Sequence, residues 1–125
     1  MLANKDAMAT IAVKDLGKAR EFYEGVLGFT PAGGQEDGTV TYRSGGSSVL
    51  VYKSDFAGTN KATSATWNVG GELEAIVRDL KAKGVAFEHY DMPGTALRGD
   101  IHVSNSVQVA WFKDPDGNII SIFKG

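Results

Sequence analysis

The side chains of this sequence that could do chemistry gather in one stretch, residues 89–102. His89 and His102 are its only histidines, and Asp91 and Asp100 lie close to them in sequence. Imidazole and carboxylate groups can hold a divalent metal ion, and an imidazole can act as a general acid or base. Two uses follow: a metal site, for which the segment must fold back, or metal-free proton transfer by His89. The competing interpretation is that both histidines are exposed or hydrogen-bonded without a chemical role.

Other kinds of reactive site are harder to build from these residues. The chain has no cysteine, which excludes disulfides, thiolate metal sites and cysteine nucleophiles. No serine has an assignable histidine partner, so no activated nucleophile is identified. The Gly-Gly pairs lack the Lys-Ser/Thr ending of a phosphate-binding loop, and residues 114–117 lack the spaced acidic positions of a calcium loop. We interpret these segments as turns.

Composition predicts one globular domain. With 125 residues, of which 42% are hydrophobic, the chain can bury a core of its own. The charged residues nearly balance, and the net charge of -2 gives no basic patch for nucleic acid or an anionic membrane. The N-terminal segment is broken by Asn4, Lys5 and Asp6, and no apolar run approaches a membrane span. We therefore expect a cytoplasmic protein that binds neither nucleic acid nor membrane.

The clearest structural element is a β-hairpin near the C-terminal end, WFKDPDGNIISIF, residues 111–123. Pro115 presets φ for a tight turn, and Gly117 is free to take a positive φ. Apolar alternation before the turn and β-branched residues after it predict the two strands.

The first half of the chain predicts a βαβββ unit. A strand is expected over residues 7–14, followed by a helix that Asp15 caps and Gly28 ends. The next strand is expected to end at Gly33–Gly34, and a hairpin follows over residues 39–53.

The second half repeats this order after a small, polar linker over residues 54–63. A strand is expected at residues 64–69, then a helix that ends at Gly84, then a strand at residues 85–90. An irregular loop is expected over residues 91–104, before the closing hairpin. Such a long loop is either a functional lid or a surface excursion without a role.

Fixed offsets between the halves support a duplication. Val13 and Val69 lie 56 positions apart, whereas the hairpins align at an offset of 70, which pairs Tyr42 with Phe112. The sequence therefore predicts an α+β fold with two βαβββ modules in one chain. These are module one, residues 7–53, and module two, residues 64–124, within a single domain of residues 1–125.

Alternation divides each predicted strand into two faces. We assign the strongly apolar face to the side covered by the helices. It contains Ile11, Val13, Leu50, Tyr52, Trp67, Val69, Ile120 and Ile122. If the closing hairpin pairs Phe112 with Ile119, Val107, Val109 and Trp111 join this face, whereas a shift of one residue would put Trp111 in the cleft. The opposite face mixes apolar, hydroxyl and amide groups, which is typical of a pocket lining but also of a sheet face in contact with water.

The hairpin and residues 12–29, AVKDLGKAREFYEGVLGF, together resemble the vicinal oxygen chelate superfamily. That superfamily includes glyoxalase I, ring-cleaving dioxygenases and the bleomycin-resistance binding proteins. The resemblance covers nearly all of the chain. It implies a curved mixed sheet around a cleft, with the helices on the outer face, and a homodimer. The strand edges that two such modules expose also favour a dimer.

The resemblance also locates the metal-ligand positions of the metal-dependent members. Their His and Glu ligands come from the first and last strands of each module, and the matching positions here are Met8, Val51, Ser64 and Ser121. A thioether and two neutral hydroxyls are too weak to replace imidazole and carboxylate ligands. We therefore expect no metal and no other cofactor.

The expected function is metal-independent binding of a small, largely apolar or aromatic molecule in the sheet cleft. The alternative is an enzyme, a glyoxalase-like lyase or isomerase or a dioxygenase relative, that uses His89 or a displaced metal site. Binding needs only a shaped cavity, whereas an enzyme needs a reactive group that the sequence does not identify. The expected ligand-binding residues are Met8, Thr10, Tyr42, Val51, Ser64, Thr66, Phe112, Ser121 and Phe123.

Overall fold

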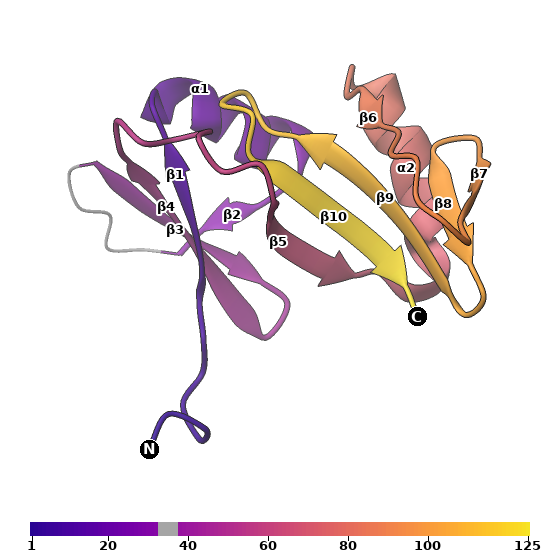
Figure 1. The fold of residues 1–125 in the computed structure, drawn as a ribbon. Coiled ribbons are helices and arrows are strands. Elements are labelled where there is room, and N and C mark those ends of the chain that lie inside the picture. Colours follow the sequence, from indigo (N-terminus) through magenta and orange to yellow (C-terminus); the bar gives the residue numbers. More distant parts are fainter. Residues whose placement is uncertain (33–37) are drawn as a thin grey trace.

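A computed structural model of the chain describes residues 1–32 and 38–125. The described strands form two mixed sheets, one in each half of the chain, and β1 of the first half lies beside β5 of the second (Figure 1). The predicted α+β fold with two modules is confirmed. The predicted end of the second strand, Gly33–Gly34, lies outside the described residues.

Module one has one sheet with the strand order β1-β4-β3-β2. Its elements are β1 (Ala9–Val13), α1 (Leu16–Arg20), the π-helical segment η1 (Glu21–Val26), β2 (Thr30–Pro31), β3 (Thr39–Ser44) and β4 (Ser47–Lys53). As predicted, Asp15 caps α1, because its side chain accepts a 3.1 Å hydrogen bond from the Lys18 N–H. Gly28 ends the helical segment with a φ of 80°, a value that favours glycine.

Module two has a larger sheet with the order β5-β10-β9-β8-β7, and β6 also pairs with β9. Its elements are β5 (Thr63–Asn68), the 3-10 turn η2 (Gly70–Glu72), α2 (Leu73–Ala82), β6 (Phe87–Glu88), β7 (Ala96–Arg98), β8 (Ile101–Ser104), β9 (Val107–Lys113) and β10 (Ile119–Lys124). The buried face of α2 is formed by Leu73, Val77 and Leu80, which have helical spacing.

The segment predicted as an irregular loop contains a β-hairpin instead. β7 and β8 pair across Gly99 and Asp100, where Gly99 has a φ of 63°. β8 then pairs with β9, so the hairpin widens the second sheet. The prediction was wrong because β7 has three residues, too few for alternation to be visible.

The turn between β9 and β10 joins the two modules. The buried Asp114 carboxylate accepts hydrogen bonds from the Tyr23 hydroxyl at 2.8 Å and from the Asn118 backbone N–H at 2.9 Å. The Asn118 side chain donates to the same carboxylate and to the Ala12 carbonyl, at 2.8 and 2.7 Å. Burial and the neighbouring Asp114 raise the pKa of Tyr23 far above its ordinary value, so the phenol remains a donor.

The linker between the modules packs against this turn as well. A Cβ atom at Gly58 would collide with the carbonyl oxygen of Asp116. The Asp116 carboxylate also accepts a 3.1 Å hydrogen bond from the Lys14 backbone N–H of module one. The sequence motif that predicts a turn therefore also holds module one against module two.

The core lies between the helices and the sheets. The residues buried there come from both modules and form one contiguous cluster, which indicates that the modules fold together. Within the described residues, no helix is long and apolar enough to cross a membrane. The main strand contributions to the core are Ile11, Val13, Val40, Tyr42, Val49, Val51, Ala110, Phe112, Ile120 and Ile122.

Candidate ligand-binding site

Each sheet has one face that packs against helices and one that does not, and we call the uncovered faces together the open face. Strand pairing identifies the residues that share it, since paired residues point to the same side. Several of these side chains, such as Thr10, Thr66 and Phe123, are half-exposed or exposed. The open face includes Thr10, Ala12, Thr39, Thr41, Arg43, Leu50 and Tyr52 of module one, and Thr66, Asn68, Val107, Val109, Trp111, Lys113, Ser121 and Phe123 of module two.

The open face brings together several residues expected to bind a ligand. Ser121 stands opposite Thr66, and their hydroxyl oxygens are 2.7 Å apart. Phe123 lies on the same side, opposite Asn68. The predicted placement of Thr66, Ser121 and Phe123 on one face is therefore confirmed. Thr10 lies on the open face of module one, opposite Leu50.

Met8 and Ser64 lie next to this face at the starts of their modules. Met8 immediately precedes β1 and is 45% exposed, and Ser64 is half-buried in β5. Met8 lies two positions before the open-face residue Thr10. Ser64 lies two positions before Thr66, where the pairing register of β5 and β10 shifts. They can therefore border the same surface.

Three residues expected in the cleft lie on the helix-covered face instead. Tyr42 and Val51 are fully buried, and Phe112 is buried with its ring 6.3 Å from that of Phe22. The prediction was wrong because β4 is apolar on both faces, so alternation within the strand does not reveal which face is covered. Its pairing with β1, which places Val51 opposite Ile11, decides this. The same uncertainty about β4 placed Leu50 and Tyr52 in the core. The errors at Phe112, Val107 and Val109 come from the pairing register of β9 and β10.

Trp111 also lies on the open face, although the sequence predicted a core position. β9 and β10 pair Lys113 with Ile119, one residue away from the predicted pairing of Phe112 with Ile119. A shift of one residue moves every side chain of a strand to the other face. Trp111 consequently lies opposite Ser121. Trp67, by contrast, takes its predicted place on the helix-covered face, 5.7 Å from the ring of Phe29.

An aromatic group that the sequence did not reveal lies beside Trp111. The Trp111 ring meets those of His102 and Tyr90 edge to face, at 4.9 and 5.3 Å between centroids. His102 is 1% exposed, and its Nε2 accepts a 2.9 Å hydrogen bond from the Tyr90 backbone N–H. The proton of the neutral ring therefore sits on Nδ1, which has no hydrogen-bond partner within the described structure. The sequence does not reveal this aromatic group, because His102 reaches Trp111 only through the pairing of β8 with β9. That pairing places His102 opposite Val109, on the same face of β9 as Trp111.

His89 points to a different set of partners. Its Nε2 lies 2.7 Å from Oδ1 of Asp100, whose other oxygen lies 2.7 Å from Nζ of Lys81. The hydrogen bond from Lys81, followed by that from His89, holds the pKa of Asp100 below its ordinary value. The segment does fold back, since the rings of His89 and His102 are 6.3 Å apart. Within residues 1–32 and 38–125, no group of three or more His, Cys, Asp or Glu side chains is placed to hold a metal ion.

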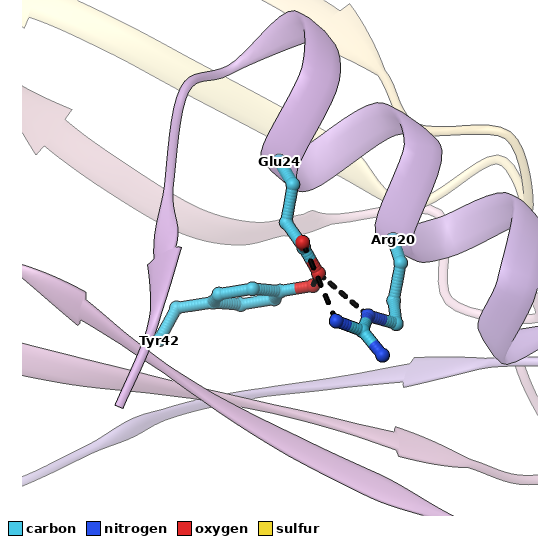
Figure 2. Close-up of polar contacts among 3 residues, drawn as sticks. All are labelled: Arg20, Glu24 and Tyr42. Atoms are coloured by element: carbon cyan, nitrogen blue, oxygen red, sulfur yellow. Dashed lines mark hydrogen bonds and ion pairs between the residues drawn. The ribbon is translucent and has the colours of Figure 1, made fainter. Parts of the chain in front are cut away.

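Figure 2 shows the role that Tyr42 has in place of ligand contact. Its hydroxyl donates a 2.8 Å hydrogen bond to Oε2 of Glu24, and the same oxygen accepts from Nε of Arg20 at 2.6 Å. The hydrogen bond from Arg20, and then that from Tyr42, lowers the pKa of Glu24. Burial, together with Glu24, raises the pKa of Tyr42, which remains a neutral donor. The contact ties β3 to the helical segment η1.

Strand register also corrects the metal-ligand positions implied by the resemblance. Ser121 lies opposite Thr66, and the equivalent of Thr66 in module one is Thr10, which lies opposite Leu50. Leu50, rather than Val51, is therefore the counterpart of Ser121. A thioether, an aliphatic side chain and two neutral hydroxyls do not fit the divalent ions of the family, and the Ser121 hydroxyl is already hydrogen-bonded. The residues at the four positions are Met8, Leu50, Ser64 and Ser121.

Comparison with solved structures finds the same fold in several proteins. An integron cassette protein from the mobile metagenome of the Halifax Harbour sewage outfall aligns with a TM-score of 0.73 at 19% identity, covering 98% of this chain and 99% of that one. An antibiotic-binding protein from Streptomyces sp. CB03234 aligns with a TM-score of 0.63 at 22% identity, covering 99% and 98%. The fosfomycin resistance protein FosX from Listeria monocytogenes, solved with Mn(II) and sulfate, aligns with a TM-score of 0.71 at 16% identity, covering 100% and 92%.

At these identities the likeness shows the fold alone. No curated protein matches the chain. A family model, however, matches residues 7–122, which include module one, all but the last two residues of module two, and the turn that joins them. The chain therefore belongs to the Glyoxalase/Bleomycin resistance protein/Dioxygenase superfamily.

Proposed function

We propose that this protein binds a small, uncharged, largely apolar or aromatic molecule on the open face, without a metal ion. The observation that carries the proposal is the donor set at the four family positions, which contains no imidazole and no carboxylate. Uncharged side chains at these positions favour a neutral group of the ligand there, because a charged group would lose hydration without gaining a partner. The four uncharged residues are Met8, Leu50, Ser64 and Ser121.

Module two supplies the aromatic part of the proposed site. Trp111 and Phe123 are half-exposed on the open face, and Tyr90 stands at the edge of Trp111. Burying apolar surface contributes roughly 25 cal/mol per Å², partly offset by the cost of ordering the ligand. The hydroxyls of Thr66 and Ser121 can orient a polar group of the ligand. The proposed contacts are Met8, Thr10, Ser64, Thr66, Trp111, Ser121 and Phe123.

The structural neighbours support a small-molecule ligand. One is an antibiotic-binding protein, and another is a fosfomycin resistance protein. A cavity for binding requires no reactive side chain, and His89, the candidate acid or base, is already hydrogen-bonded to Asp100. We place the protein in the cytoplasm as part of the same proposal.

Calorimetry on variants of the open face tests this function. Native mass spectrometry of the purified protein, or a screen of uncharged aromatic compounds, supplies the ligand. Ser121→Trp and Thr66→Trp fill the face and should weaken binding at least about tenfold, equivalent to ~1.4 kcal/mol. Lys18→Trp, an exposed position on α1, is the matched control and should bind as the wild type does.

Addition of EDTA or of Mn(II) should leave the affinity unchanged. Two results would contradict the proposal: undiminished affinity in folded Ser121→Trp and Thr66→Trp variants, or binding that requires the metal ion.

We also propose that the protein is a homodimer. The sheets end in the short edge strands β2 and β7, whose outer backbone groups can pair with another chain. Light scattering at micromolar concentration should report twice the mass of one chain. A mass of 13.3 kDa, that of a single chain, would show that the proposed dimer does not form.

A further inference from the structure

An apolar hollow lies on the helix-covered side of the molecule, where the two modules meet. Its volume is about 210 Å³, and every side chain that lines it is aliphatic or aromatic. We call it the helix-side cavity. Its walls include Leu27 and Phe29 of module one, and Trp67, Val69, Ile76 and Leu80 of module two.

The helix-side cavity is separate from the open face. Trp67 lies opposite Ile122 on the helix-covered face of the second sheet, and both line the cavity. Trp111 lies opposite Ser121 on the other face of the same sheet. The two tryptophans of the chain therefore report on the two sites separately.

The cavity offers apolar contact area without charge. The indole N–H of Trp67 donates to the Ser44 hydroxyl at 2.8 Å, so the one polar atom of that side chain is satisfied elsewhere. No lining residue is titratable, and a charged ligand would lose its hydration without a partner. Phe29, Trp67 and Ile76 are only half-buried, so a molecule that covers them removes apolar surface from water.

We propose that the helix-side cavity is a second binding site, which takes one uncharged hydrocarbon-like molecule of one or two rings. An apolar cavity of about 150 Å³ stays dry and binds benzene, and this cavity is larger. Because its walls come from both modules, a bound molecule stabilises the contact between them and raises the melting temperature. The site goes beyond the function proposed for the open face and does not depend on it.

Fluorine NMR with 5-fluorotryptophan tests the second site directly. The labelled protein has two ¹⁹F resonances, which Trp67→Phe and Trp111→Phe variants assign. Toluene should shift the Trp67 resonance in a saturable manner and raise the melting temperature. Benzoate, of similar size but charged, should do neither.

Two variants that reduce the volume of the cavity complete the test. Ile76→Phe and Val69→Phe should each weaken toluene binding at least tenfold, whereas Ser121→Phe on the open face should leave the Trp67 shift unchanged. If one cavity variant does not fold, the other variant and the titration of the wild type still test whether toluene binds in the helix-side cavity. The proposal is overturned if toluene does not move the Trp67 resonance, if benzoate moves it equally, or if a folded cavity variant keeps its affinity. Toluene that moves only the Trp111 resonance would support the open-face function and overturn this second site.

Discussion

The two modules share one order of elements, yet their open faces carry different side chains. In module one this face is rich in threonine, and its larger side chains are Leu50, Tyr52 and Arg43. In module two it carries Trp111 and Phe123, and the added β7–β8 hairpin brings in His102. A repeated backbone fixes where side chains point, whereas residue identity decides what each face can bind.

The hairpin turns of the two modules differ in the same way. The turn between β3 and β4 consists of exposed glycines, Gly45 and Gly46. The turn between β9 and β10 buries Asp114 and contacts Tyr23 of module one. One turn only connects two strands, whereas the other also holds the two modules together.

The largest expected effect tests which face of β4 is covered in module one. Val51→Glu places a carboxylate at a position that is 0% exposed and should cost about 4 kcal/mol or more of the free energy of unfolding. Leu50→Glu puts the same group on the open face and should change stability by no more than about 1 kcal/mol. Urea unfolding of both variants measures the difference. A reversed order of the two costs would mean that Leu50, and not Val51, is the core residue.

The next effect tests the unequal turns. Asp114→Ala removes the acceptor of Tyr23 and Asn118 and leaves buried donors unsatisfied, which should cost about 3 kcal/mol. Asp55→Ala, in the exposed part of the linker, is the control and should stay within about 0.5 kcal/mol of the wild type. Equal unfolding midpoints for the two variants in urea would refute the role of Asp114 in joining the modules.

The smallest effect compares one carboxylate in each module at acidic pH. Glu24 and Asp100 have pKa values below their ordinary values of 4.5 and 3.8. A carboxylate whose pKa is lowered by folding stabilises the fold at pH values above its ordinary pKa. This contribution is lost as the pH falls through the pKa of the folded state. Glu24→Gln and Asp100→Asn should therefore melt no more than about 3 °C below the wild type at pH 7.

The same two variants should lose less stability than the wild type between about pH 6 and pH 3, because they lack the titrating group. Differential scanning calorimetry across this range provides the measurement. Identical pH profiles for the wild type and a variant would show that the carboxylate replaced in that variant does not contribute to the pH dependence of stability.

The sequence by itself determined the order of the elements outside residues 91–104, the helix ends and the duplication. These features depend on neighbouring residues: Asp15 bonds to a backbone N–H three positions on, and Gly28 adopts a positive φ that other residues disfavour. The assignment of Ile120 and Ile122 to the core was also correct, because β10 is apolar on that face. Helical periodicity and turn chemistry are local, and sequence reasoning detects them.

Only the tertiary structure decided which residues form the open face. A turn that closes one residue later moves Trp111 from the core to the open face, and the partner of β4 determines that Val51 is buried. His102 joins Trp111 because β8, too short to predict, pairs with β9. These outcomes depend on pairing between residues far apart in the chain, and a shift of one residue reverses the face of a strand while leaving its own alternation unchanged.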